Sequence, residues 1–147
     1  MYRILLADDD LEVRSGVADL LGALGLEILQ AETGLEALEI VKDEVIHAAL
    51  LDWNMPVCTG LEILPRLRDR FCDLPCILYS GNLTAGMEGV ALRAGAFSVM
   101  RKPVRPDLLR SEIQRALDEY ERLTQLRGSD DTGLDDTGLD DRNNALN

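Results

Sequence analysis

Acidic side chains end two apolar runs of this sequence, and their types and spacing suit a divalent-metal site or phosphoryl chemistry. The run at residues 2–7 leads into Asp8 and Asp9, and the run at residues 48–51 ends at Asp52. If these runs are neighbouring strands of a sheet, their carboxylates meet at one edge and repel each other unless a cation is present. An aspartate placed there can also attack a phosphoryl group as a nucleophile.

Other polar residues follow the same rule of position. Asn54 comes just after Asp52, Ser80 ends the apolar run that starts at Cys76, and Lys102 follows the run at residues 97–101. A lysine supplies positive charge to a phosphoryl group, a hydroxyl donates a hydrogen bond to it, and Mg²⁺ prefers hard oxygen ligands. The set therefore predicts a Mg²⁺-dependent phosphoryl-accepting site.

The elements that must position these residues alternate between strand and helix five times. Regular alternation of this kind predicts a parallel sheet with helices on both faces. We expect the flavodoxin-like doubly wound α/β fold with five strands in the order 2-1-3-4-5, which makes the first and third strands neighbours. The expected strands are residues 2–7, 27–32, 48–52, 76–80 and 97–101, and the second, short and mixed in polarity, is expected at an edge.

Capping residues and apolar stripes locate the helices. Asp10 is expected to cap the first helix, whose stripe includes Leu24, and Leu35 is expected to point inward from the second. The helix at residues 84–94 contains Gly86 and Gly89, and each interior glycine costs about 1 kcal/mol of helix stability relative to alanine. We expect it to be the loosest helix.

Composition excludes several classes of function. The chain has 147 residues and a formal net charge of −12, which disfavours direct binding to nucleic acid or to an anionic membrane surface. No apolar stretch approaches the length of a transmembrane helix. The three cysteines lack a zinc-type spacing, so reduced thiols in a cytoplasmic protein are expected.

Residues 128–147 differ in character from the rest of the chain. An Asp-Asp-Thr-Gly-Leu unit occurs twice there, and the segment carries six aspartates and one arginine. Such a polar, acidic composition is typical of disorder. We therefore expect one domain at residues 1–127, followed by a disordered acidic tail that does not form an output domain for binding DNA.

The ordered set of motifs resembles the receiver domain of two-component response regulators, over roughly residues 1–122. The matching segments include Asp8-Asp9, Asp52-Trp53-Asn54-Met55-Pro56, Ser80-Gly81 and Lys102-Pro103. The segment from Asp52 to Pro56 is especially similar to that of single-domain, chemotaxis-type regulators.

This resemblance implies a role for each site residue. Asp52 would be the phosphoacceptor. Asp9, Asp52 and the backbone carbonyl of Asn54 would ligate Mg²⁺ directly, and Asp8 mainly through water. Ser80 would turn toward the phosphate, and Lys102 would pair first with the acids and later with the phosphate. Asn54 and Asn82 would tune hydrolysis of the phosphoaspartate.

The resemblance also implies a signalling phosphoacceptor rather than an enzyme, with only self-phosphorylation and self-dephosphorylation. A sensor histidine kinase or histidine phosphotransfer protein would supply the phosphoryl group, and an unknown downstream protein would read a switched surface. The chain would be a monomer or a phosphorylation-linked dimer. The family usually has an aromatic residue at the position of Val99, so transmission from Ser80 is expected to differ here, and Gly81 adds backbone freedom.

Three other interpretations remain open. Asp52 alone could merely cap the turn before Pro56. A haloacid-dehalogenase-like phosphatase also uses an aspartyl nucleophile and Mg²⁺, but it needs a second acid where this chain has Asn54. A scaffold that keeps the fold without the chemistry is the third. His47, the one histidine, is expected at the surface and is a poor candidate for phosphorylation.

Overall fold

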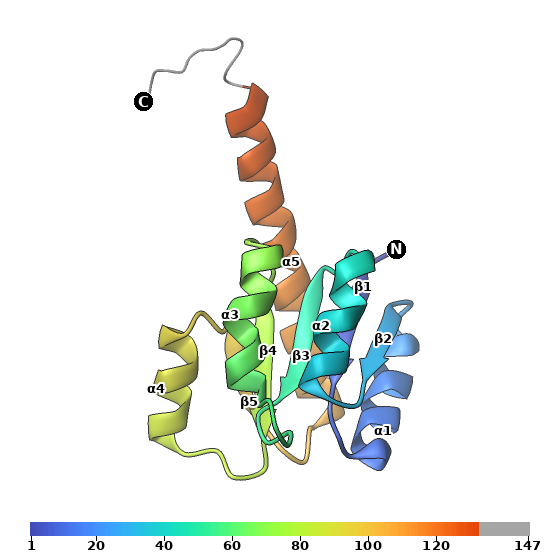
Figure 1. The fold of residues 1–147 in the computed structure, drawn as a ribbon. Coiled ribbons are helices and arrows are strands. Elements are labelled where there is room, and N and C mark those ends of the chain that lie inside the picture. Colours follow the sequence, from blue (N-terminus) through green and yellow to red (C-terminus); the bar gives the residue numbers. More distant parts are fainter. Residues whose placement is uncertain (133–147) are drawn as a thin grey trace.

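A computed structural model describes residues 1–132, with side chains described as far as Arg127. Five parallel strands form one sheet in the order β2-β1-β3-β4-β5, as predicted (Figure 1). The strands are β1 (Arg3–Ala7), β2 (Glu27–Ala31), β3 (Ala48–Asp52), β4 (Cys76–Ser80) and β5 (Ser98–Arg101), and the helices are α1 (Leu11–Gly22), α2 (Gly34–Asp43), α3 (Gly60–Arg70), α4 (Ala85–Arg93) and α5 (Pro106–Thr132).

Alternate side chains of each strand pack into two separate hydrophobic layers. Leu5 and Leu51 face α2, α3 and α4, whereas Ile4 and Leu50 face α1 and α5. Because both faces of the sheet are covered, β3 and β4 are buried along their whole length. The two layers hold every strand in a fixed register, and so fix where each strand ends.

The register brings the functional ends of the strands to one edge. Ala7 pairs with Leu51, Asp52 pairs with Tyr79, and Ser80 pairs with Arg101. The residues that follow β1, β3, β4 and β5 therefore emerge side by side. The predicted adjacency of the first and third strands is confirmed.

Side-chain caps begin the helices. The carboxylate of Asp10 accepts hydrogen bonds from the backbone N–H groups of Glu12 and Val13, which confirms its predicted role as a cap. Thr59 and Glu62 form a reciprocal capping box at the start of α3. These caps set where α1 and α3 start, immediately after the loops that carry the site.

Two predicted core positions are wrong. Leu24 is exposed because α1 ends at Gly22 and the chain turns at Gly25, where φ is +84°. Leu35, in the first turn of α2, is exposed because the buried stripe of that helix runs through Gly34, Ala37 and Val41 instead.

Helix α4 is loosely packed, as its glycines predict. Among its residues only Ala91 is buried, and Val90 and Leu92 are exposed.

Helix α5 continues past Gly128 to Thr132 and projects beyond the sheet (Figure 1). The rest of the predicted acidic tail lies outside the described residues, and its disorder stays a prediction.

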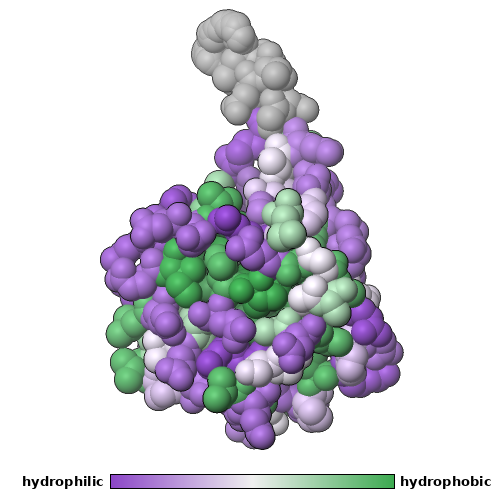
Figure 2. Space-filling model, turned by 90° about the vertical axis from the view of Figure 1, so that its right-hand side faces the viewer, coloured by the Kyte–Doolittle hydropathy of each residue, from purple (hydrophilic) through white to green (hydrophobic). Residues whose placement is uncertain are grey.

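The side of the molecule where β2 forms the sheet edge carries apolar surface within a polar rim (Figure 2). Ile28 and Leu29 of β2 are only half-buried. In the described part of the chain, no helix combines the length and apolar character needed to span a membrane.

Alanine substitutions at two glycines should have opposite effects on the stability of the fold. A Cβ at Gly60 would lie 2.5 Å from the carbonyl oxygen of Asp52, whereas a Cβ at Gly86 would have no contact closer than 4.0 Å. Gly60→Ala should therefore lower the free energy of unfolding by about 1–3 kcal/mol through overpacking. Gly86→Ala should raise it by about 0.5–1 kcal/mol through helix propensity. Urea unfolding of both variants checks this, and equal stabilities would contradict it.

Candidate functional site

Three carboxylates meet where β1 and β3 end. Asp8, Asp9 and Asp52 each place a carboxylate oxygen within 4.8 Å of the others. Asp8 and Asp52 are buried, with 0% and 3% of their surface exposed, and Asp9 is exposed. The three carboxylates therefore converge as the sequence predicts. Electrostatic repulsion is expected to be strongest between Asp8 and Asp52, the two that are buried.

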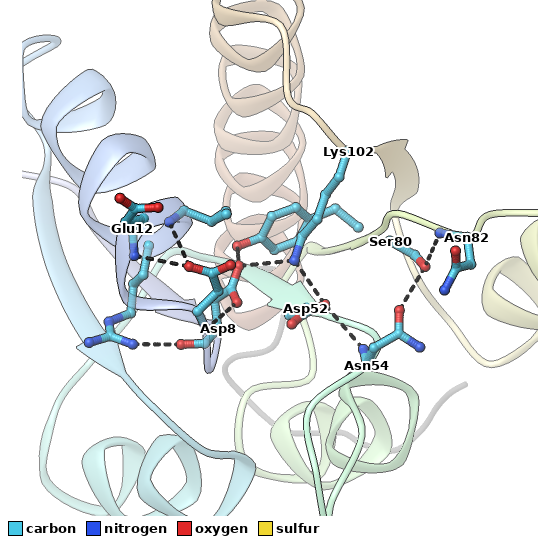
Figure 3. A network of polar contacts seen from close by, with 11 residues as sticks. Asp8, Glu12, Asp52, Asn54, Ser80, Asn82 and Lys102 are labelled. Atoms are coloured by element: carbon cyan, nitrogen blue, oxygen red, sulfur yellow. Dashed lines mark hydrogen bonds and ion pairs between the residues drawn. The ribbon is translucent and has the colours of Figure 1, made fainter.

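Lys102 partly neutralises the buried pair. Its Nζ lies 3.2 Å from Asp8 Oδ2 and 3.2 Å from Asp52 Oδ1, and its side chain is 19% exposed (Figure 3). The peptide bond between Lys102 and Pro103 is cis. One ammonium group thus serves two carboxylates, which leaves the cluster with excess negative charge.

Burial raises the pKa of Asp52 from its ordinary 3.8 to about 6, and the neighbouring carboxylate of Asp8 adds to the rise. The backbone N–H of Asn54, which donates to Asp52 Oδ1 at 3.1 Å, and the Lys102 ammonium both act to lower the pKa. Asp52 is therefore mostly ionised at neutral pH, in the form that a nucleophile needs.

Ser80, Asn54 and Asn82 form a connected polar group beside Asp52 (Figure 3). The Ser80 hydroxyl donates to Asn54 Oδ1 at 2.9 Å and accepts from the backbone N–H of Asn82 at 3.1 Å. Hydrogen bonds therefore run from the carboxylate of Asp52 to the loop that precedes α4. The amide side chain of Asn82 has no part in this chain of contacts.

The donor set fits Mg²⁺. Three carboxylates supply hard oxygen ligands, and their excess negative charge favours a dication. Cysteine and histidine, which favour softer metals, do not belong to the cluster. The Asp8, Asp9 and Asp52 side chains are thus able to hold the metal that the sequence predicts.

Tyr79 and Arg14 complete the surroundings of Asp8, and the sequence analysis missed both. The Tyr79 hydroxyl donates to Asp8 Oδ2, and the backbone N–H of Asp10 donates to Asp8 Oδ1 at 2.9 Å. Arg14, which is buried, donates from Nη1 to the carbonyl oxygen of Asp8 at 2.7 Å. A tyrosine within the aliphatic strand β4 was the available signal, since a buried hydroxyl needs a partner.

Burial raises the pKa of Tyr79, and its hydrogen bond to Asp8 raises it further. The phenol is therefore protonated at neutral pH. Its oxygen carries a proton to donate, and the Asp8 carboxylate is the acceptor.

Arg101 and His47 differ from simple surface residues. Arg101 Nη1 donates to the carbonyl oxygen of Leu83 at 2.9 Å, and so ties β5 to the loop between β4 and α4. His47, predicted at the surface before the third strand, is partly exposed there, and its Nδ1 accepts from the backbone N–H of Arg3 at 2.9 Å. It lies before β3, at the opposite edge of the sheet from Asp52.

Known proteins resemble this chain in sequence and in fold. The model of the response regulator receiver domain matches residues 4–114. The chain is 30% identical over 119 residues to a chemotaxis protein CheY homolog of Campylobacter jejuni, and the match covers 78% of this chain and 92% of that protein.

Two further similarities are to a longer protein and to a solved structure. The transcriptional activator protein ExaE of Pseudomonas putida is 33% identical over 124 residues, which are 83% of this chain but only 58% of ExaE. A CheY-like receiver domain protein from Methanospirillum hungatei has a similar structure, with a TM-score of 0.79 and 30% identity, covering 83% of this chain and 98% of that one.

The raised pKa of Asp52 makes stability depend on pH. The folded protein binds this proton more tightly than the unfolded chain, so stability falls as pH rises from 3.8 toward 6 and the loss is complete above that range. Without metal, Asp52→Asn should therefore be more stable than wild type by about 3 kcal/mol at neutral pH, and no more stable below about pH 4. Urea unfolding in EDTA measures this, with the exposed Asp19→Asn as control. A difference in stability between Asp52→Asn and wild type that does not change with pH would contradict the raised pKa of Asp52.

Proposed function

Because this chain belongs to the response regulator receiver domain family, we propose that Asp52 accepts a phosphoryl group in a two-component phosphorelay, in a reaction that requires Mg²⁺. The ion pair of Lys102 with both Asp8 and Asp52 is the observation that carries this proposal. It puts a positive charge directly beside an ionised nucleophile. That pairing is what transfer of a negatively charged phosphoryl group requires.

The contacts of Asp52 assign different tasks to its two oxygens. Oδ1 accepts from the Asn54 N–H and lies near Lys102 Nζ, whereas none of the described residues donates to Oδ2. Oδ2 is therefore the attacking atom. Its lone pair forms the new oxygen–phosphorus bond while the bond from phosphorus to the donor's nitrogen or oxygen breaks, and the donor leaves with that electron pair.

The carboxylates of Asp8, Asp9 and Asp52 would hold the metal. By the family resemblance, the backbone carbonyl of Asn54 would join them, and Asp8 would act mainly through a metal-bound water. When bound, Mg²⁺ supplies positive charge that offsets the repulsion between the carboxylates and the incoming phosphoryl oxygens. Lys102 supplies a second charge, and the Ser80 hydroxyl supplies a hydrogen-bond donor. Asn54 and Asn82, which flank Ser80, set how water reaches the phosphoaspartate and so its lifetime.

The partners follow from this chemistry. A sensor histidine kinase or a histidine phosphotransfer protein donates the phosphoryl group, and a downstream protein reads the result. When Ser80 turns toward the phosphate, it leaves Asn54 and Asn82, and this alters the loop before the loosely packed α4. Phosphorylation thereby changes a protein-binding surface on α4, β5 and α5, in a monomer or through a phosphorylation-linked dimer.

The free thiols of this chain support the cytoplasm as the place where the phosphoryl transfer occurs. The three cysteines are free thiols that form no disulfide: Cys58, Cys72 and Cys76. Reduced cysteines are the rule where glutathione and thioredoxin keep the redox potential low.

Acetyl phosphate, a small donor, tests the acceptor directly. With Mg²⁺, the intact mass of the wild-type protein should rise by one phosphoryl group, and Asp52→Ala or an excess of EDTA should abolish the gain. Rapid release of phosphate from many phosphoesters would instead indicate a phosphatase. A mass that stays unchanged with every donor would indicate a phosphate-independent scaffold.

Lys102 should affect metal binding and phosphoryl transfer in opposite directions. Lys102→Ala removes a cation that competes with Mg²⁺ for Asp8 and Asp52, so Mg²⁺ should bind more tightly. It also removes charge that the transferred group needs, so phosphorylation at saturating Mg²⁺ should slow by about tenfold or more. Lys42→Ala is the matched control, because Lys42 pairs with Glu39 on the exposed surface of α2. An unchanged rate in Lys102→Ala would contradict the role.

A further inference from the structure

We propose that Tyr79 is a positioning residue of the phosphoryl-accepting site, whose hydroxyl orients Asp8 for Mg²⁺ and lets Lys102 turn to the phosphoryl group. This inference rests on the proposed function and names a residue that the ligand set and the acceptor do not include. It stands on the contacts of one buried side chain.

The first step is the location of the hydroxyl. Tyr79 is fully buried, and it precedes Ser80 on β4, so the two side chains point to opposite faces of the sheet. The ring packs in the layer of α1 and α5, among Val17, Leu109 and Ile113. In that apolar surrounding the hydroxyl reaches the Asp8 carboxylate, which lies at the end of β1, two strands away.

The second step is the sharing of one oxygen. Asp8 Oδ2 accepts from the Tyr79 hydroxyl and also pairs with Lys102 Nζ at 3.2 Å. The two donors differ in their effect on Mg²⁺ binding. Lys102 brings a positive charge that opposes a dication, whereas the phenol is neutral and held in place by its buried ring.

The third step concerns Lys102, which lies against the same ring. Its Nζ is 4.7 Å from the centre of the Tyr79 ring, so the ring face supports the ammonium while the hydroxyl satisfies Asp8. Once Lys102 turns to a phosphoryl group, the phenol keeps a donor on Asp8 Oδ2. Without the hydroxyl, Lys102 would be the remaining donor on that oxygen and would be held there more tightly.

Removal of the hydroxyl should therefore weaken Mg²⁺ binding. A partner that orients a metal ligand from the outside typically changes metal affinity or activity by about 10–100-fold when it is mutated. In Tyr79→Phe we expect the Mg²⁺ concentration that half-saturates the site to rise by about tenfold. The ring, its packing and its contact with Lys102 are kept.

A matched pair of variants tests this in the full-length protein. Tyr79→Phe removes a hydroxyl that donates to Asp8, and Tyr2→Phe removes one that donates to Glu121, away from the site. Mg²⁺ binding is followed by the fluorescence of Trp53, the single tryptophan, which is next to Asp52. Phosphorylation by acetyl phosphate is then measured across Mg²⁺ concentrations, and thermal unfolding in EDTA reports the fold.

Each outcome decides. A half-saturating Mg²⁺ concentration that rises in Tyr79→Phe and not in Tyr2→Phe, together with a slower phosphorylation that saturating Mg²⁺ restores at least in part, supports the positioning role. A lower rate that saturating Mg²⁺ does not restore, with unchanged Mg²⁺ binding, shows a structural role and overturns it. Equal behaviour of Tyr79→Phe, Tyr2→Phe and an active wild type overturns it as well. If wild type neither binds Mg²⁺ nor gains a phosphoryl group, the proposed function fails and the inference fails with it.

Discussion

Asp8 and Asp52 are buried side by side with one shared ammonium group, and the sheet and its covering helices must hold them there. Two desolvated carboxylates with a single cation are unfavourable, because charge repulsion grows where water is excluded. The fold holds them there by burying β1 and β3 on both faces. The same repulsion favours the binding of a dication between the carboxylates. The feature that destabilises the site without metal is therefore the one that lets it bind Mg²⁺.

Close packing around the strand ends keeps this arrangement fixed. The capping box of Thr59 and Glu62 starts α3 at Gly60, where the backbone passes too close to Asp52 for a side chain. Arg14 holds the carbonyl of Asp8, and the N–H groups of Asp10 and Asn54 hold the two carboxylates. The acids are thus positioned mainly by hydrogen bonds to and from the backbone next to them.

The sequence predicted the fold and most of the site, because both follow from local rules. Apolar runs that end in Asp8 and Asp52 indicate neighbouring parallel strands, and Lys102 follows the last strand at the same edge. Leu24 was misplaced because a periodic stripe does not show that a helix ends two residues earlier, at Gly22. The contact between Tyr79 and Asp8 depends on which of two layers each side chain enters, and the spacing along the chain carries no such information.

Helix α5 has a mechanical consequence of its own. Its first turn follows Lys102 closely, and its 27 residues extend for about 40 Å, more than twice the length of a strand in this sheet. Near the opposite edge of the sheet, Tyr2 bonds to Glu121 and Arg127 pairs with Asp73 at 2.7 Å. The helix is therefore anchored both beside the site and near the opposite edge of the sheet, so a shift of its first turn would also strain these two distant contacts, while its C-terminal part projects beyond the sheet (Figure 1).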